Sequence, residues 1–158
     1  MSTDRPHIQI VAERDQAAVR RTLQALPEWF GDPIAIDNYT ADAADERYTS
    51  LLARKNDEIV GVALTARHFR ESAELHLIAV PPTARGRGIG RALTERACSD
   101  LVNDQCLFLT VHTVGPSYED DGYAQTRAFY RRLGFTPLEE HNGLDWAGPT
   151  LILVRPLT

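Results

Sequence analysis

Several residue types and patterns are scarce in this chain of 158 residues. Its two cysteines, Cys98 and Cys106, have a spacing that fits neither a metal site nor a disulfide framework, so we expect reduced, half-buried thiols. No apolar run approaches the ~20 residues of a membrane-spanning helix, and the first residues lack the basic-then-apolar pattern of a signal peptide. We therefore expect a cytoplasmic protein with no bound metal and no membrane partner.

The formal net charge is −5, which argues against a nucleic-acid partner and favours a cationic one. Hydrophobic residues make up 43% of the chain and charged residues 25%, as is ordinary for globular proteins. The chain is long enough to bury a core, and no linker, repeat or low-complexity segment interrupts it. We therefore predict a single domain over residues 1–158.

Hydrophobic periodicity predicts strands and helices along the whole chain. We expect strands over residues 7–12, 48–54, 58–68, 73–80, 107–114, 135–140 and 150–155. We expect helices over residues 15–25, 34–45, 88–104 and 123–133, the last closed by Gly134 as a C-cap. This order indicates an α/β (α+β) fold with a mixed sheet and helices on both faces, not a doubly wound sheet.

The loop over residues 80–91 joins a predicted strand to a predicted helix. Gly86, Gly88 and Gly90 alternate with arginines where the helix begins. Uncovered N–H groups and the helix dipole favour an anion at such a position. Pro81-Pro82 ends the strand sharply, because proline cannot donate to a ladder. The loop therefore predicts a pyrophosphate site, although a tight turn with solvated arginines is the alternative that the loop alone leaves open.

The spacing of this loop excludes two common phosphate-binding fingerprints. A Walker loop needs Gly-Lys-Ser/Thr, but the only lysine of the chain is Lys55. A Rossmann fingerprint that starts at Gly86 would need glycine at position 91, which is Arg91.

Two motifs carry a resemblance to a known family. Arg85-x-x-Gly-x-Gly90, preceded by Ala-Val-x-Pro, resembles the acyl-coenzyme A loop of the GNAT (Gcn5-related N-acetyltransferase) superfamily. The segment 126–135 resembles the superfamily's Ala-x-x-x-Tyr-x-x-x-Gly-Phe helix. Since the predicted element order matches over essentially the whole chain, the resemblance implies a mostly antiparallel sheet of six to seven strands, flanked by about four helices. It also implies a splayed parallel pair of central strands.

The resemblance further implies an N-acetyltransferase that moves an acetyl group from acetyl-CoA to a primary amine. The backbone around Val80 would pair with the pantetheine arm, and the Val80 N–H would polarise the thioester carbonyl. The usual asparagine and alanine of the second motif are Tyr123 and Thr126, so contacts from that helix to the cofactor are in doubt. The expected cofactor-binding residues are Ile78, Ala79, Val80, Arg85, Gly86, Arg87, Gly88, Ile89, Gly90, Arg91, Tyr123 and Tyr130.

Three residues are candidates for proton transfer. Tyr130 falls on the superfamily's tyrosine position, and a tyrosine pKa of ~10 suits a donor to a thiolate whose thiol pKa is ~8.5. Glu74 and His76 lie on one face of a predicted strand, and either would serve as the base, with His112 a weaker candidate. The alternatives are a core tyrosine and polar groups on a partly solvated sheet. No cysteine lies beside the site in sequence, so we expect direct attack in a ternary complex.

The acceptor pocket is predicted from Trp29, Phe30, Tyr39 and the loop from Tyr118 to Asp121, whose acidic residues suit a cationic amine on a small molecule or a peptide. The alternative is that Trp29 and Phe30 only fasten a helix to the sheet. A monomer and a homodimer are both open. Two rival functions also remain, namely a catalytically silent acyl-CoA sensor and a nucleotide-binding protein.

Overall fold

The computed structural model describes residues 7–158. Its strands are β1 (Ile8–Ala12), β2 (Tyr48–Lys55), β3 (Glu58–Arg67), β4 (Ser72–Ala79), β5 (Phe108–Val114), β6 (Thr136–Asn142) and β7 (Pro149–Pro156). Its helices are α1 (Gln16–Gln24), α2 (Pro33–Asp42), α3 (Ile89–Asn103) and α4 (Asp121–Arg132), with a short 3-10 helix, Pro82–Ala84, before α3. The predicted order of strands and helices is confirmed.

The described residues form a mixed sheet of seven strands in the order β1-β2-β3-β4-β5-β7-β6. The pairs β1–β2, β2–β3, β5–β7 and β6–β7 are antiparallel, whereas β4 and β5 are parallel, with Ser72–Leu75 opposite Phe108–Val111. This confirms the predicted GNAT-type sheet with a parallel pair and four helices. The splaying of that pair beyond Leu75 and Val111 stays a prediction.

Some predicted boundaries were wrong. The second helix ends at Asp42 rather than at residue 45, because the Asp45 carboxylate accepts hydrogen bonds from the backbone and side chain of Arg47 and forms a turn. The fourth helix begins at Asp121 rather than at residue 123, since Asp120 acts as its N-cap and accepts from the Tyr123 N–H. The 3-10 helix was not predicted.

The described chain divides into two compact units. The first unit comprises the residues up to Ala66 together with Leu77–Ser99, and the second comprises Arg67–His76 together with Asp100–Thr158. Strand β4 and helix α3 therefore each contribute residues to both units. The prediction of a single domain over residues 1–158 stays a prediction.

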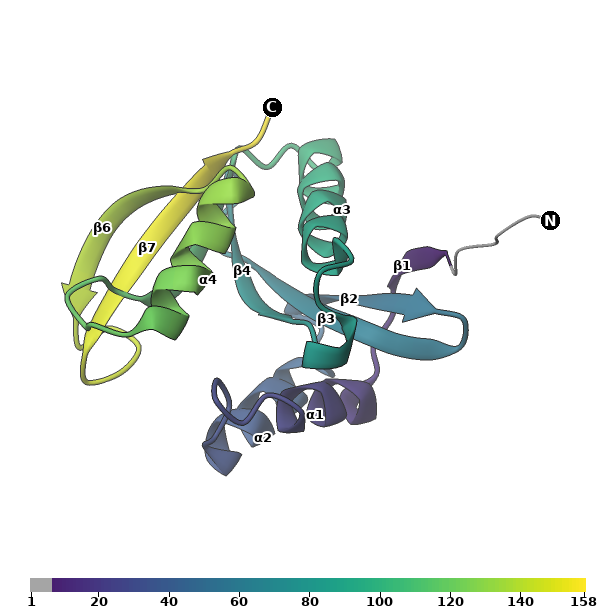
Figure 1. The fold of residues 1–158 in the computed structure, drawn as a ribbon. Helices are drawn as coiled ribbons and strands as arrows, with labels where there is room; N and C mark the ends of the chain where they lie inside the picture. Colours follow the sequence, from purple (N-terminus) through teal and green to yellow (C-terminus); the bar gives the residue numbers. More distant parts are fainter. Residues whose placement is uncertain (1–6) are drawn as a thin grey trace. The chain divides into compact units, whose positions relative to one another are not determined.

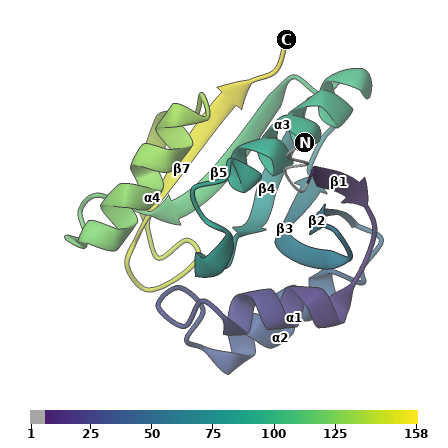
Figure 2. The same ribbon diagram turned by 45° about the vertical axis from the view of Figure 1, so that its right-hand side comes forward.

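In the first unit, α1 and α2 lie side by side on one face of β2 and β3, and α3 begins on the opposite face (Figures 1 and 2). Val19 and Leu23 of α1 belong to one buried cluster with Leu52 of β2 and with Val62 and Leu64 of β3. Burying each of these side chains contributes about 1.5–3 kcal/mol. The Asp15 carboxylate caps α1 by accepting from the Ala18 N–H at 2.9 Å, which fixes where the helix starts.

On the opposite face of this unit, the close approach of α3 to the sheet depends on Gly61 of β3. A Cβ at Gly61 would lie 2.8 Å from Ile89 Cγ2 and 3.1 Å from Leu93 Cδ1, both on α3. Only a residue without a side chain lets α3 approach the strand this closely. Gly61 therefore sets the position of the helix that follows the glycine-rich loop.

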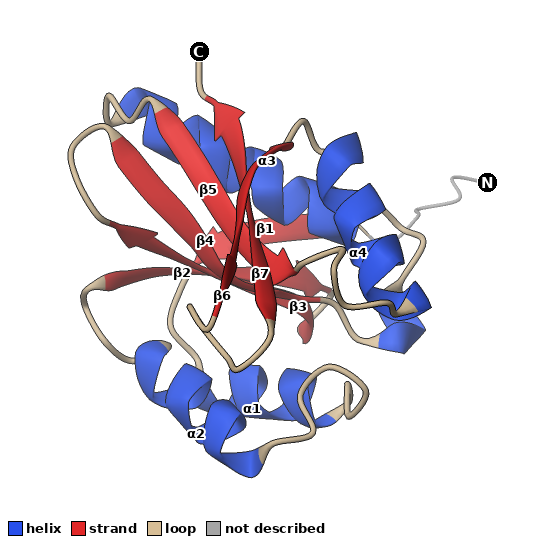
Figure 3. Ribbon diagram, turned by 90° about the vertical axis from the view of Figure 1, so that its left-hand side faces the viewer, coloured by secondary structure: helices blue, strands red, loops and turns tan. Residues whose placement is uncertain are grey.

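In the second unit, α4 covers one face of the ladder formed by β5, β7 and β6 (Figures 1 and 3). Arg127 of α4 donates to the Val114 carbonyl of β5 at 2.9 Å. Arg155 of β7 donates to the Leu133 carbonyl, at the C-terminal end of α4, also at 2.9 Å. Gly134 follows with φ +92°, so the predicted C-cap is confirmed.

Candidate active site

The glycine-rich loop lies in the first unit and leads directly into α3. Gly86 and Gly88 have φ +78° and +73°, a conformation that L side chains rarely adopt, and no atom lies within 4 Å of where a Cβ would be. The two glycines are therefore required by the path of the backbone, not by close packing. The first turn of α3 supplies N–H donors and the positive end of the helix dipole at this loop.

The arginines of the loop are exposed, whereas Ile89 is 2% exposed and packs as a core residue. Arg85 and Arg87 form no ion pair with a carboxylate in the part of the chain that the structure describes. The loop thus presents positive charge and open backbone together. These features suit an anion such as a pyrophosphate.

Strand β4 alternates between buried and half-buried residues along its whole length. Glu74, His76 and Ile78 take the half-buried face, and Leu75, Leu77 and Ala79 take the buried one. The predicted sharing of a face by Glu74 and His76 is therefore observed. The half-buried Val80 follows the strand in the first unit.

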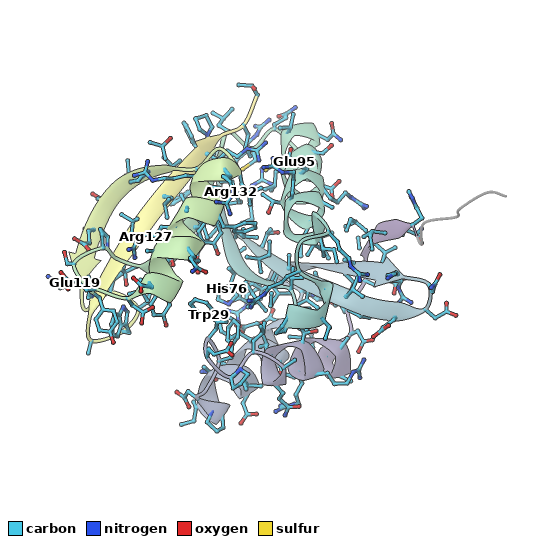
Figure 4. All side chains as sticks on the ribbon, in the orientation of Figure 1. Trp29, His76, Glu95, Glu119, Arg127 and Arg132 are labelled. Atoms are coloured by element: carbon cyan, nitrogen blue, oxygen red, sulfur yellow. The ribbon has the colours of Figure 1, made fainter. Side chains whose placement is uncertain are left out.

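The Glu74 carboxylate, in the second unit, lies between two imidazoles. His68 Nε2 is 2.9 Å from Glu74 Oε1, and His76 Nδ1 is 4.0 Å from Glu74 Oε2 (Figure 4 shows His76 on β4). His76 first, then His68 and the charge of His112, lower the pKa of Glu74 from 4.5 to about 2, against the effect of burial. The Glu74 side chain is 18% exposed and is ionised at any pH near neutrality.

His112 of β5 has a carboxylate partner of its own. Its Nδ1 lies 2.9 Å from Asp145 Oδ2, which belongs to the loop between β6 and β7. Neither Asp145 nor His68 was predicted as a site residue. Asp145 lies in a loop, and His68, expected at the end of the strand over residues 58–68, follows β3, which ends at Arg67.

Tyr130 lies in the second unit and is 7% exposed. Its ring is 5.8 Å from the ring of Phe135, at 73°. This burial is compatible with both roles considered for Tyr130, a core residue and a proton donor shielded from water. Burial first, then Asp120 and Tyr118, raises the pKa of Tyr123, the other tyrosine that was predicted to contact the cofactor.

The predicted acceptor residues belong to both units. In the first, Trp29, Phe30 and Tyr39 are partly buried against the core, with the Phe30 and Tyr39 rings 5.8 Å apart and perpendicular. This packing fits the alternative considered for Trp29 and Phe30, and a role of the three residues in an acceptor pocket stays a prediction. In the second, Tyr118 is 45% exposed and lies 5.5 Å, ring to ring, from Trp146. A pocket that combines the two groups stays a prediction.

Trp146 was missed by the sequence analysis. It lies in the loop that joins β6 and β7 and is 40% exposed. The sequence did carry a signal for Trp146, because a large aromatic residue stands between Gly143 and Gly148, in a segment where no strand or helix was expected.

Cys98 and Cys106 are reduced thiols, as predicted, but both are buried rather than half-buried. Cys106 lies close to the Glu71 and Phe108 carbonyls, with its Sγ donating to them at 3.5 and 3.4 Å, because the chain turns from α3 into β5 there. Among the described residues, no group of three or more potential ligands is arranged to hold a metal ion. None of the helices in residues 7–158 is long and apolar enough to cross a membrane.

Known proteins resemble this chain in sequence and in fold. A mycothiol acetyltransferase from Beutenbergia cavernae is 36% identical over 96 residues, which are 58% of this chain and 30% of that relative. The chain spans about a third of the length of the curated relatives that it matches. A GNAT-family protein from Desulfovibrio desulfuricans is 23% identical with a TM-score of 0.84, covering 96% of this chain and 100% of that one.

A GNAT-family acetyltransferase from Elizabethkingia anophelis, solved with acetyl-CoA bound, has a TM-score of 0.72 at 19% identity and covers 97% of this chain and 100% of that one. At these identities the structural likenesses establish the fold alone. The family model described as the acetyltransferase (GNAT) domain matches residues 46–137, which include β4, the glycine-rich loop and α4. Because this match covers more than half of the chain, the chain belongs to the GNAT acetyltransferase domain family.

Proposed function

We propose that this chain transfers an acetyl group from acetyl-CoA to a primary amine by direct attack in a ternary complex. The observation that carries the proposal is the loop from Arg85 to Gly90. Its left-handed glycines and exposed arginines precede α3 and suit the pyrophosphate of coenzyme A. Following the family pattern, the backbone of Ile78, Ala79 and Val80 would pair with the pantetheine arm, and the Val80 N–H would polarise the thioester.

His76 is better suited than Glu74 to accept the proton of the amine. An alkylammonium has a pKa near ~10.4 and an ordinary imidazole near ~6.5. The Glu74 carboxylate, with its pKa lowered to about 2, is a much weaker proton acceptor than an ordinary imidazole. If His76 Nδ1 carries the proton and points to Glu74 Oε2, which is 4.0 Å away, Nε2 keeps its lone pair for the amine. Glu74 would then position and stabilise the charged imidazole.

Tyr130 would return a proton to the departing thiolate. A phenol with an ordinary pKa of ~10 can protonate a thiolate whose conjugate acid has a pKa of ~8.5 only when the two are held together, out of competition with water. The 7% exposure of Tyr130 supports this role. Neither cysteine is exposed, which supports direct attack by the amine over an acyl-cysteine intermediate.

Thiol release from acetyl-CoA with a library of amines tests the proposal. Tyr130→Phe and His76→Gln should each lower kcat, by about a hundredfold for the base, with little change in the affinity for coenzyme A. His141→Gln is a matched control, because His141 lies on β6 with a partner, Glu139, at 3.1 Å outside this cluster. If the protein binds coenzyme A but no amine or peptide yields free thiol, it is a silent acyl-CoA sensor. If ATP and NAD raise its Tm and coenzyme A does not, the loop holds another nucleotide.

Three further predictions concern the acceptor, the location of the protein in the cell and its oligomeric state. The acceptor is an amine of a small molecule or of a peptide, and the thiol-release library separates these two. The protein is cytoplasmic, which cell fractionation tests. Whether it is a monomer or a homodimer is measured by its mass in solution.

A further inference from the structure

Three aromatic side chains gather in the second unit, from three different segments. Tyr118 precedes α4, Tyr123 lies in its first turn, and Trp146 lies between β6 and β7. The ring of Tyr118 is 5.5 Å from that of Trp146, at 83°, and 6.4 Å from that of Tyr123, at 72°. We call these three residues the aromatic corner, because the rings of Tyr118 and Trp146 are nearly perpendicular and present two faces at a right angle.

The Trp146 side of the corner is fixed to the loop backbone. The indole Nε1 donates to the Pro149 carbonyl at 3.0 Å. A Cβ at Gly148 would lie 2.3 Å from atoms of the indole ring, so the ring rests against a backbone that only glycine leaves open. Trp146 therefore holds one position without help from a ligand.

The Tyr118 side is fixed by a different set of contacts. Glu140 of β6 accepts from the Ser117 N–H at 3.1 Å and from the Ser117 hydroxyl at 2.8 Å, and these bonds lower the pKa of Glu140. Gly115 leaves room for the Glu140 carboxylate, since a Cβ there would lie 2.2 Å from its Oε1. Because both sides of the corner are held by the protein itself, a ligand that binds there pays little ordering entropy.

The corner is open and its surroundings are acidic. Tyr118 and Trp146 are 45% and 40% exposed, so ring surface remains after the contacts between them. The faces of such rings carry partial negative charge and attract cations. Glu119, Asp120 and Asp121 directly follow Tyr118 (Figure 4 shows Glu119 at the loop before α4), and Asp145 precedes Trp146.

Two positive groups of this unit, His112 and Arg127, already have partners. His112 is paired with Asp145 at 2.9 Å, and Arg127 donates to the Val114 carbonyl. Glu119 and Asp121 form no ion pair within the described part of the chain. Exposed aromatic faces, with these two carboxylates on the same loop and in the first turn of α4, favour an alkylammonium over a neutral group of the same shape.

We propose that the aromatic corner binds an alkylammonium group of the acceptor other than the amine that is acetylated. The acceptor is then at least dicationic, either a small polyamine or a peptide that carries a second amine. This assignment rests on the proposed function for its place in the reaction. Cation binding at the corner itself is measured without turnover.

The direct test uses ¹⁵N-labelled indole groups, because the chain has two tryptophans, Trp29 and Trp146, and Trp146→Phe assigns their signals. Choline and its neutral isostere 3,3-dimethylbutan-1-ol are titrated at constant ionic strength. We expect choline to shift the Trp146 signal in a saturable way and the neutral alcohol to leave it unchanged. An equal response to both compounds, or no response to choline, would overturn the assignment.

The kinetic test compares amines that differ in a single charge. A diamine should exceed the amino alcohol of the same length in kcat/KM by about five- to thirtyfold, from contacts with two ring faces. Trp146→Ala and Tyr118→Leu should bring this ratio close to one, and Trp146→Phe should keep part of it. Leu144→Ala, an exposed apolar residue of the same loop, is the matched control.

The two tests separate this inference from the proposed function. If no amine yields thiol but choline still shifts Trp146 selectively, the proposed function fails and the cation site stands. If amines are acetylated but the diamine ratio is unchanged in Trp146→Ala, the corner does not bind the acceptor. If Trp146→Ala does remove the diamine preference, lysine-containing peptides in place of diamines show which source of alkylammonium the corner prefers.

Discussion

Substituting Glu74 should destabilise the fold in a way that depends on pH. The pKa of Glu74 is lowered from 4.5 to about 2, mainly by His76 and His68. A carboxyl group whose pKa is lowered by folding stabilises the native state above the unfolded pKa and loses that contribution as the pH falls through the folded pKa. The contribution is therefore complete above about pH 5 and is lost towards about pH 2.

The magnitude follows from the shift. A difference of about 2.5 pKa units corresponds to a ceiling of about 3.5 kcal/mol, at about 1.4 kcal/mol per unit. The His68 side chain is 50% exposed, so solvent screens part of this interaction and we expect about 1–2 kcal/mol. More than half of the contribution should disappear between about pH 6 and about pH 3.

Urea unfolding of the wild type and of Glu74→Gln at these two pH values measures the contribution. The difference in the free energy of unfolding should be larger at the higher pH and should shrink at the lower one. Glu28→Gln removes an exposed carboxylate of the first unit and corrects for the change in net charge. A difference between wild type and Glu74→Gln that is the same at both pH values would show that the imidazoles do not stabilise the carboxylate.

Substitutions at three further positions test other parts of the structure. Gly61→Ala should lower the free energy of unfolding by about 1 kcal/mol and Gly61→Val by up to about 3 kcal/mol, because their side chains would press against Ile89 and Leu93. Equal losses in the two variants would contradict this packing. Arg14→Lys should lose about 1 kcal/mol in urea unfolding, since the guanidinium donates to the carbonyls of residues 43, 45 and 48 and an ammonium cannot reach all of them; unchanged stability would refute this role. Gly88→Ala should weaken coenzyme A binding by about tenfold, as measured by calorimetry, because the backbone angle φ of +73° costs a residue with a side chain roughly 1 kcal/mol or more. An unchanged Kd would show that the backbone path of the loop does not matter for the cofactor.

The order of the elements could be predicted because it depends on local patterns. Buried residues recur on one side of α1, alternate residues are buried along β4, and Gly134 closes α4. The end of α2 could not be predicted from the same patterns. It depends on whether Asp45 continues the helix or forms a turn with Arg47. The Arg47 guanidinium donates to Asp45 Oδ2 at 2.6 and 3.0 Å, and these hydrogen bonds favour the turn.

The candidate site was predictable for residues on regular elements and not for those on loops. Glu74 and His76 are two positions apart on one strand, so alternation places them together. The partners His68 and Asp145 lie in a turn and a loop, 6 residues from Glu74 and 33 residues from His112. Their positions depend on how the chain returns to the sheet, which periodicity does not encode.

The loop partners change the chemistry that the strand residues can perform. From its place on the strand alone, Glu74 is a candidate for the base that accepts the proton of the amine. His76 first, then His68 at 2.9 Å, lower the pKa of Glu74 to about 2, and in the proposed function Glu74 would act as a negative charge that favours a protonated imidazole beside it. A base must hold a proton only briefly and near neutral pH, which an imidazole does better than such a carboxylate. In the proposed function, His68 therefore bears on the choice of base without having to contact the acceptor, because it helps His76 to lower the pKa of Glu74.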